Sequence, residues 1–114
     1  MKIIKNNIIP FQGFAAINLF GVLFVRKEYA NRYEGTDKFD RMIVHESIHT
    51  KQQKEMLYVF FYIWYVIEWL IRLFGCFDFN MAYRNISFEQ EAYSNEGNIN
   101  YVKNRPCYMW LGYF

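Results

Sequence analysis

One stretch of the chain restricts the fold more than any other: residues 56–74, MLYVFFYIWYVIEWLIRLF, carry only two charges, Glu68 and Arg72. A helix that is apolar on every side is either buried in a large core or lies in a membrane. These nineteen residues approach the length that crosses a bilayer, and a chain of 114 residues has little other protein to surround them. Against a span, Glu68 and Arg72 are four residues apart and can pair along one helical face. The stretch predicts a central helix, either sandwiched between a sheet and another helix or held against a membrane.

The composition narrows the remaining classes. A length of 114 residues predicts one domain over residues 1–114. Aromatic residues make up 22% of the chain, which implies an apolar core, a membrane contact or both. The 13 basic and 11 acidic residues lie scattered and leave a net charge of +2, so nucleic-acid binding is not expected. Two cysteines, Cys76 and Cys107, could pair, but neither belongs to a CxxC metal-binding pattern.

Residues 8–25, near the N-terminus, are apolar and rich in strand-forming side chains. The runs 14–20 and 22–25 predict two short strands, joined as a hairpin or a bent pair at Gly21, with a helix as the alternative. The polar residues 26–38 predict a connecting loop. The apolar stretch after the charged start contains Pro10, Gln12 and Asn18 and lacks a clean cleavage site, so a signal peptide is not expected. The location therefore stays open between the cytoplasm and a membrane.

Both histidines of the chain fall in residues 45–49, HESIH. On a helix, side chains four residues apart lie on one face, so His45 and His49 can aim two imidazole nitrogens at one point. Glu46 projects beside that point, where a carboxylate can accept a proton from a metal-bound water. A helix from about Asp37 is expected, because residues 34–40 contain N-cap residues before an apolar pattern. HExxH also occurs on surface helices that bind no metal, so the pattern is a hypothesis of a metal site.

A catalytic zinc normally has three protein ligands and a water, so a third ligand is needed. Glu55, six residues after His49, is turned about 240° around an unbroken helix and is a poor candidate. A second helix is predicted to open near Ser87 and to end near Lys103. Its segment 89–93, EQEAY, offers Glu89, with Glu91 as the alternative.

The order of HESIH and, about forty residues later, FEQEAY resembles the gluzincin metallopeptidases, and the chain length resembles the small single-domain minigluzincins. The resemblance implies Zn²⁺ held by His45, His49 and Glu89, with Glu46 as the catalytic base that activates a zinc-bound water for peptide-bond hydrolysis. Where the family has a supporting aspartate, this chain has Tyr93. That departure leaves Glu91 open as the third ligand.

These elements predict a mostly helical α+β fold. A small N-terminal β-hairpin or sheet packs on three main helices, which carry the histidines, the aromatic stretch and the glutamate. Gly75 is expected at the C′ position that ends the aromatic helix, and residues 75–80 return the chain towards the histidines. The apolar tail 107–114 is expected to dock, either on the core or in the active-site cleft as a built-in inhibitor.

The predicted activity is hydrolysis of a peptide or protein substrate. The alternative is a non-catalytic protein, either a zinc-binding one or a membrane-associated structural or sensor protein that uses residues 56–74. Four residues are candidate donors to the reaction's oxyanion: Tyr83, Arg84, Tyr93 and Tyr101. Gln52 and Gln53 are expected on the solvated face of their helix, with orientation of substrate or ligands as the alternative. Arg105 has an ordinary helix-end or salt-bridge explanation.

Overall fold

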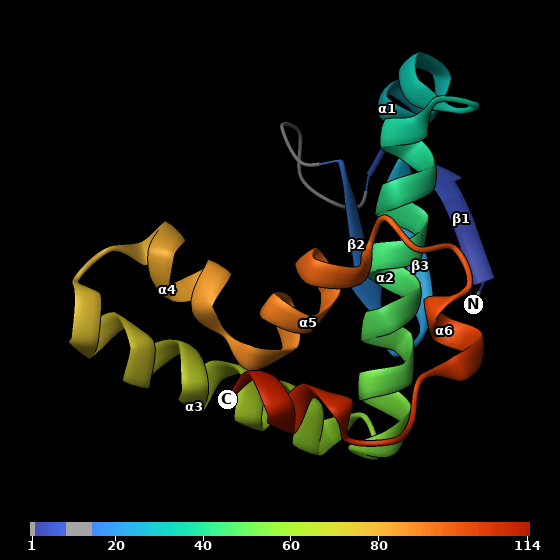
Figure 1. Cartoon of the computed structure of the whole chain (residues 1–114). Helices are drawn as coiled ribbons and strands as arrows, with labels where there is room; N and C mark the ends of the chain where they lie inside the picture. Colours follow the sequence, from blue (N-terminus) through green and yellow to red (C-terminus); the bar gives the residue numbers. More distant parts are fainter. Residues whose placement is uncertain (1, 9–14) are drawn as a thin grey trace.

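The computed structural model describes residues 2–8 and 15–114. The fold is mixed α+β, as predicted, with a small N-terminal sheet followed by helices (Figure 1). The strands are β1 (Lys2–Asn6), β2 (Ala16–Leu19) and β3 (Val22–Arg26). The helices are α1 (Lys27–Tyr33), α2 (Asp37–Glu55), α3 (Val59–Cys76), α4 (Phe79–Asn85), α5 (Ser87–Asn95) and α6 (Tyr101–Asn104), and a 3-10 helix, η1, covers Met109–Tyr113.

Over the residues that the structure describes, the sheet has the order β1-β3-β2, so β2 is its outer strand on one side. Strands β2 and β3 pair antiparallel around Gly21, whose φ of +82° favours glycine, and this confirms the predicted hairpin. The part of the first predicted strand at residue 14 lies outside the described residues. Strand β1 was not predicted; it pairs with β3 in parallel. Leu23 and Val25 of β3 are fully buried and form the sheet side of the core.

The loop predicted over residues 26–38 is wrong, because Lys27–Tyr33 forms α1. Ala30 is buried in a cluster with Phe39 and the inner face of β3, while the polar residues of α1 face outward. This tertiary contact stabilises a seven-residue helix that its polar composition concealed. Helix α2 begins at Asp37, where it was expected, and the Thr36 side chain accepts a hydrogen bond from the Phe39 N–H.

Helices α2 and α3 form the two arms of an L, and α4 and α5 return the chain into its corner (Figure 1). The arms separate at Leu57 and Tyr58, whose φ values are +54° and +60°. The prediction that Gly75 ends the aromatic helix is wrong, because α3 continues to Cys76 and Phe77 takes the left-handed capping conformation. Asp78 then caps α4 by accepting the Met81 N–H at 3.0 Å. The sharp return therefore combines a left-handed phenylalanine at the end of α3 with a side-chain cap at the start of α4.

Helix α3 is not the sandwiched helix that one reading of the sequence predicted. Its inner face is buried at Phe61 and Glu68, and the predicted pair of Glu68 with Arg72 forms at 3.2 Å. Its outer face is an uncharged apolar stripe with exposed side chains throughout: Val59, Phe60, Ile63, Val66, Ile67, Leu70, Ile71 and Phe74. Within the described part of the chain, α3 is the one helix with the length and apolar composition to cross a membrane, and 11% of its residues are buried.

Both predicted ends of the glutamate helix differ from those of α5 in the structure. Ser87 was predicted as the N-cap of the glutamate helix, but Ile86 occupies that position, and the buried Glu68 carboxylate accepts both the Ser87 N–H (2.7 Å) and the Ser87 hydroxyl (2.5 Å). Helix α5 ends at Asn95 rather than near Lys103, and the short α6 is separate. The carboxylate of Glu68 in α3 therefore caps α5, and this contact between distant residues cannot be predicted from spacing within the sequence of α5.

The apolar tail docks on the core, the first of the two predicted arrangements. Trp110 of η1 is buried and lies edge-on to Phe88 of α5, with ring centroids 4.7 Å apart. The Phe114 ring lies tilted against Trp64 of α3, with ring centroids 5.8 Å apart. The two cysteines, whose pairing the sequence left open, are free thiols.

Candidate metal centre

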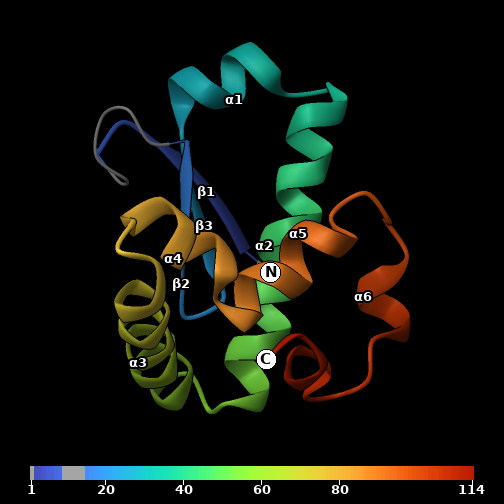
Figure 2. The same ribbon diagram turned by 60° about the vertical axis from the view of Figure 1, so that its left-hand side comes forward.

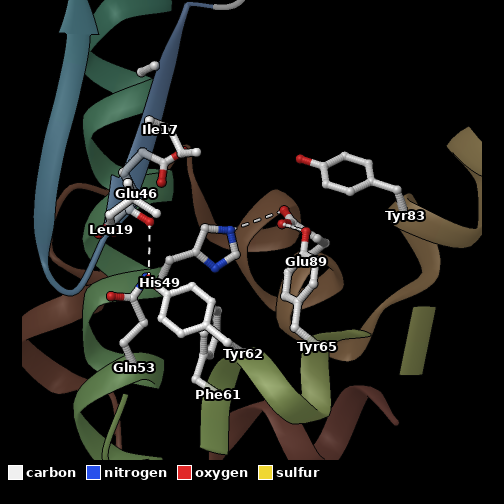
Figure 3. A pocket seen from close by; sticks show the side chains of 12 residues that line it. Ile17, Leu19, Glu46, His49, Gln53, Phe61, Tyr62, Tyr65, Tyr83 and Glu89 are labelled. Carbon is white, nitrogen blue, oxygen red and sulfur yellow. Dashed lines mark hydrogen bonds and ion pairs between the residues drawn. The ribbon is translucent and has the colours of Figure 1, made fainter. Parts of the chain in front are cut away.

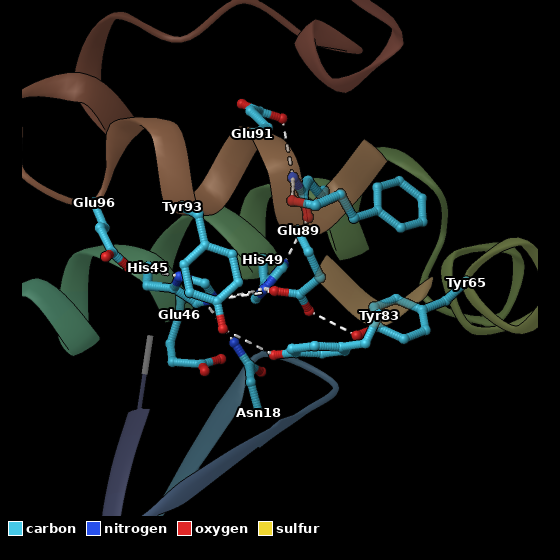
Figure 4. Close-up of polar contacts among 12 residues, drawn as sticks. Asn18, His45, Glu46, His49, Tyr65, Tyr83, Glu89, Glu91, Tyr93 and Glu96 are labelled. Carbon is cyan, nitrogen blue, oxygen red and sulfur yellow. Dashed lines mark hydrogen bonds and ion pairs between the residues drawn. The ribbon is translucent and has the colours of Figure 1, made fainter. Parts of the chain in front are cut away.

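The site lies where α5 crosses α2 (Figures 1 and 2). Nε2 of His45 and Nε2 of His49 are 3.1 Å apart, and Oε1 of Glu89 is 3.1 Å from each of them. All three side chains are buried, with exposed fractions of 7%, 6% and 4% (Figure 4). Two imidazoles and one carboxylate therefore converge as a group that could hold a metal ion.

The structure decides between Glu89 and Glu91. Glu89 lies in the first turn of α5 and faces α2, with Phe88 and Ala92 buried beside it. Glu91 is about 200° further round the helix. Its carboxylate faces away from the histidines and binds Arg105 and the hydroxyl of Tyr101 instead. Glu89 is the glutamate that joins His45 and His49.

The outer nitrogens of both rings are hydrogen-bonded to oxygens. His45 Nδ1 lies 2.9 Å from Oε2 of Glu96, and His49 Nδ1 lies 2.7 Å from Oε1 of Gln52. A carboxylate and an amide oxygen only accept, so each Nδ1 carries the hydrogen. When both rings are neutral, as a metal ligand must be, the two Nε2 lone pairs point at Glu89 and at each other. Three electron-rich atoms at mutual distances of 3.1 Å form a site that fits a cation.

The electrostatics of the group agree with this geometry. Burial alone would lower the pKa of His49, but the Glu89 carboxylate, with smaller contributions from Glu46 and Gln52, raises it to about 9. Burial would raise the pKa of Glu89, but His49 and His45 hold it well below its ordinary value. The site therefore keeps an ionised carboxylate in a buried position and favours positive charge between its members.

Glu46 lies on α2 beside the triad and lines two open spaces on either side of it. The first is a pocket of about 280 Å³ with a largely aromatic wall (Figure 3). Its lining residues are Ala16, Ile17, Asn18, Leu19, Glu46, His49, Gln53, Phe61, Tyr62, Tyr65, Tyr83 and Glu89. The second, polar space is lined by Asp37, Lys38 and Arg41, among others. Burial raises the pKa of Glu46, although His49 and His45 partly oppose the shift. None of these lining residues comes from the tail 107–114.

Strand β2 is held over α2 beside Glu46. The Asn18 amide donates to the Glu46 carbonyl at 2.9 Å and to the Thr50 hydroxyl at 2.8 Å. At the turn, the Gly21 N–H donates to Oε1 of Gln53 at 2.8 Å. Gln52 and Gln53 are 0% and 1% exposed, so the prediction that they lie on a solvated face is wrong. They face inward because the sheet covers one of them and α5 the other.

Of the four candidate oxyanion donors, two lie at the site. Tyr83 lines both open spaces, and its hydroxyl is 3.4 Å from that of Tyr93. The Tyr93 ring lies edge-on to His45, with centroids 4.5 Å apart, in the position where the family resemblance led us to expect an aspartate. Arg84 lies behind, over the Tyr93 ring at 3.9 Å, and Tyr101 binds Glu91 away from the pocket.

The sequence did not identify two residues that support the site, Glu96 and Tyr65. Glu96, which takes the supporting position on His45, follows Glu89 by seven residues, a spacing that returns to the same helical face and could have identified it. Tyr65 donates from its hydroxyl to Oε2 of Glu89 at 2.6 Å and so holds the oxygen that faces away from the histidines. It belongs to the aromatic stretch, where nothing distinguishes it from its neighbours.

No protein-family model, no curated protein and no solved structure matches the chain. The function must therefore be argued from the chemistry of these residues.

Proposed function

We propose that the protein is a zinc-dependent metallopeptidase of the gluzincin type. The observation that carries the proposal is the buried group of His45, His49 and Glu89 with Glu46 beside it at an open pocket. Two imidazoles and one carboxylate form the His₂Glu donor set of catalytic zinc sites. Nitrogen ligands suit zinc better than calcium or magnesium, which prefer oxygen.

When bound, Zn²⁺ supplies Lewis acidity that polarises a carbonyl group and acidifies water. The protein's own residues complete the reaction. Glu46 accepts the proton of the attacking water at its carboxylate and returns it to the leaving amine. The Tyr83 hydroxyl, which lines the same pocket, donates a hydrogen bond to the oxyanion of the tetrahedral intermediate.

Strand β2 supports a peptide substrate. Within the described residues it is the outer strand of the sheet, and it lines the pocket, so an extended peptide bound there runs along β2. The pocket is lined by the rings of Phe61, Tyr62 and Tyr65, and it accommodates an apolar side chain of that peptide (Figure 3). Backbone pairing gives affinity without sequence specificity, and the apolar pocket selects the residue at the cleavage site.

A structural zinc site is the competing proposal, and it requires a fourth protein ligand. Over the residues that the structure describes, the group that could hold a metal has three members. Glu91, the other glutamate of the segment 89–93, is bound by Arg105 instead. This supports a site with a position open to water and substrate.

We further propose that the outer face of α3 contacts a membrane. The stripe Val59 to Phe74 defined above carries no charge along the 18 residues of the helix. The inner face of α3 is bound to the rest of the domain through the contact of Glu68 with Ser87. This contact favours a helix that lies in the plane of the membrane–water interface over one that crosses the membrane. Trp64 and Trp69 flank the stripe, and such side chains prefer the level of the lipid headgroups.

The test of the proposed activity compares wild type with His49→Ala and Glu46→Gln, expressed with zinc and washed with a weak chelator. We expect about one zinc per chain in wild type and Glu46→Gln, and none in His49→Ala. A peptide library analysed by mass spectrometry is expected to be cleaved by wild type alone. Zinc without cleavage in wild type would overturn the peptidase and leave a metal-binding protein, and absence of zinc would overturn both.

A further inference from the structure

Gln52 is the fully buried side chain behind His49. Its Nε2 donates to the Phe88 carbonyl at 3.0 Å and to Oε1 of Glu91 at 2.9 Å. Both partners only accept, so the NH₂ end of the amide must face them. The amide oxygen is thereby directed at His49 Nδ1, 2.7 Å away. The orientation of Gln52 thus fixes which nitrogen of His49 carries the hydrogen and which faces the metal centre.

Glu91, the acceptor that orients Gln52, is itself held by one cation. Its side chain is 0% exposed, and that of Arg105 is 2% exposed. The guanidinium contacts both Glu91 oxygens, with Nη2 2.9 Å from Oε1. Its other side binds Glu55, with Nη1 3.0 Å from Oε2 and Nη2 2.8 Å from Oε1. Arg105 therefore fixes the plane of the Glu91 carboxylate and compensates its buried charge.

From these contacts we propose that Arg105 is a positioning residue of the metal centre and acts through Glu91 and Gln52 on His49. The proposal rests on the metal site of the proposed function. The chain Arg105, Glu91, Gln52, His49 joins the segment between α6 and η1 to a ligand on α2. When the Arg105 guanidinium is removed, the Glu91 carboxylate keeps the hydrogen bond from the Tyr101 hydroxyl to Oε2 but loses the Arg105 contact that holds Oε1. Oε1 is then no longer fixed opposite the Gln52 amide, and the hydrogen bond that orients the His49 ring is weakened.

The planar guanidinium of Arg105 holds the Glu91 and Glu55 carboxylates at the same time. A lysine in place of Arg105 keeps the positive charge but cannot hold two carboxylates with parallel hydrogen bonds. Arg105→Lys therefore separates charge compensation, which it retains, from positioning, which it loses in part. Arg105→Gln removes both. Tyr108→Phe is the matched control, because the Tyr108 hydroxyl anchors the same segment to the Glu55 carbonyl without contacting Glu91.

The experiment measures the affinity for Zn²⁺ by competition with a chromogenic chelator, for wild type, Arg105→Gln, Arg105→Lys, Gln52→Leu, the double variant Arg105→Gln/Gln52→Leu and Tyr108→Phe. Changes to residues that support metal ligands typically reduce affinity about 10- to 100-fold. We expect about a 10-fold loss in Arg105→Gln, less in Arg105→Lys and none in Tyr108→Phe. The double variant is expected to bind as Gln52→Leu does, because the two residues act in series. The visible spectrum of the Co²⁺-loaded protein is expected to change in Arg105→Gln and Gln52→Leu alike.

The outcomes separate the two proposals. Wild type that binds zinc, with affinity losses that add in the double variant, would overturn the positioning role and leave the metal site intact. Unchanged zinc affinity in Arg105→Lys and Arg105→Gln would do the same. If Arg105→Gln does not fold, Arg105→Lys and Gln52→Leu decide the matter. Wild type that binds neither Zn²⁺ nor Co²⁺ would overturn the proposed function and this inference together.

Discussion

Replacement of Glu68 by glutamine tests how Glu89 is held beside His45 and His49. The Glu68 carboxylate is 0% exposed and accepts from the Ser87 N–H, the Ser87 hydroxyl and Arg72. A glutamine of nearly the same size has one acceptor oxygen, which can still accept the Ser87 N–H only if its NH₂ group faces the Ser87 hydroxyl, and that hydroxyl must then accept instead of donate. The first turn of α5, two residues before Glu89, then loses part of its cap.

The magnitude follows from these contacts. A hydrogen bond to a charged group contributes about 1.5–3 kcal/mol, and a buried donor left without a partner costs about 1–3 kcal/mol. We therefore expect Glu68→Gln to lower the free energy of unfolding by about 2–3 kcal/mol, because the hydrogen bonds from Ser87 and Arg72 lose their charged acceptor while Arg72, which is 28% exposed, stays partly solvated. Ser87→Ala removes only the hydroxyl and keeps the backbone contact. We expect it to lower the free energy of unfolding by about 1 kcal/mol.

Urea unfolding followed by far-UV circular dichroism measures both variants on the same scale. Zinc affinity of the folded fraction is measured alongside, since a displaced α5 moves Glu89 away from His45 and His49. A Glu68→Gln variant within 1 kcal/mol of wild type, or one no less stable than Ser87→Ala, would refute the argument that Glu68 is the cap of α5.

Three further predictions address the ligand, the tail and the outer face of α3. Glu89→Ala is expected to lose zinc in elemental analysis, whereas Glu91→Ala keeps measurable binding; the reverse result would make Glu91 the ligand. Trp110→Ala is expected to lower the free energy of unfolding by about 3 kcal/mol by leaving a cavity beside Phe88, without raising the cleavage rate, and a faster enzyme would instead support an inhibitory tail. Ile63→Gln, on the exposed stripe, is expected to reduce co-sedimentation with phospholipid vesicles, while Ile99→Gln, 75% exposed outside the stripe, leaves it unchanged. Equal loss in both variants, or no sedimentation of wild type, would contradict the membrane contact.

The sequence determined the elements whose signals are local. The spacing of His45 and His49 placed two imidazoles on one face of a helix, and Thr36 lies at its N-cap because side-chain capping depends on neighbouring residues. The turn at Gly21 and the strand-forming side chains on either side of it predicted the β2–β3 hairpin. Periodicity and capping act within a few residues, so a single sequence is enough to read them.

Tertiary structure decided everything that joins distant segments. The choice of Glu89 over Glu91 depended on which face of α5 meets α2, and that face is set by Phe88 and Ala92 in the core. Helix α1 forms because Ala30 finds a buried contact, although its own composition is polar. The start of α5 has no side-chain cap from its own segment; the carboxylate of Glu68, which belongs to α3, accepts the Ser87 N–H instead. The members of the candidate metal site are thus readable as residue types in the sequence, but their orientation comes from hydrogen bonds between residues up to 51 positions apart, which only the packed fold brings together.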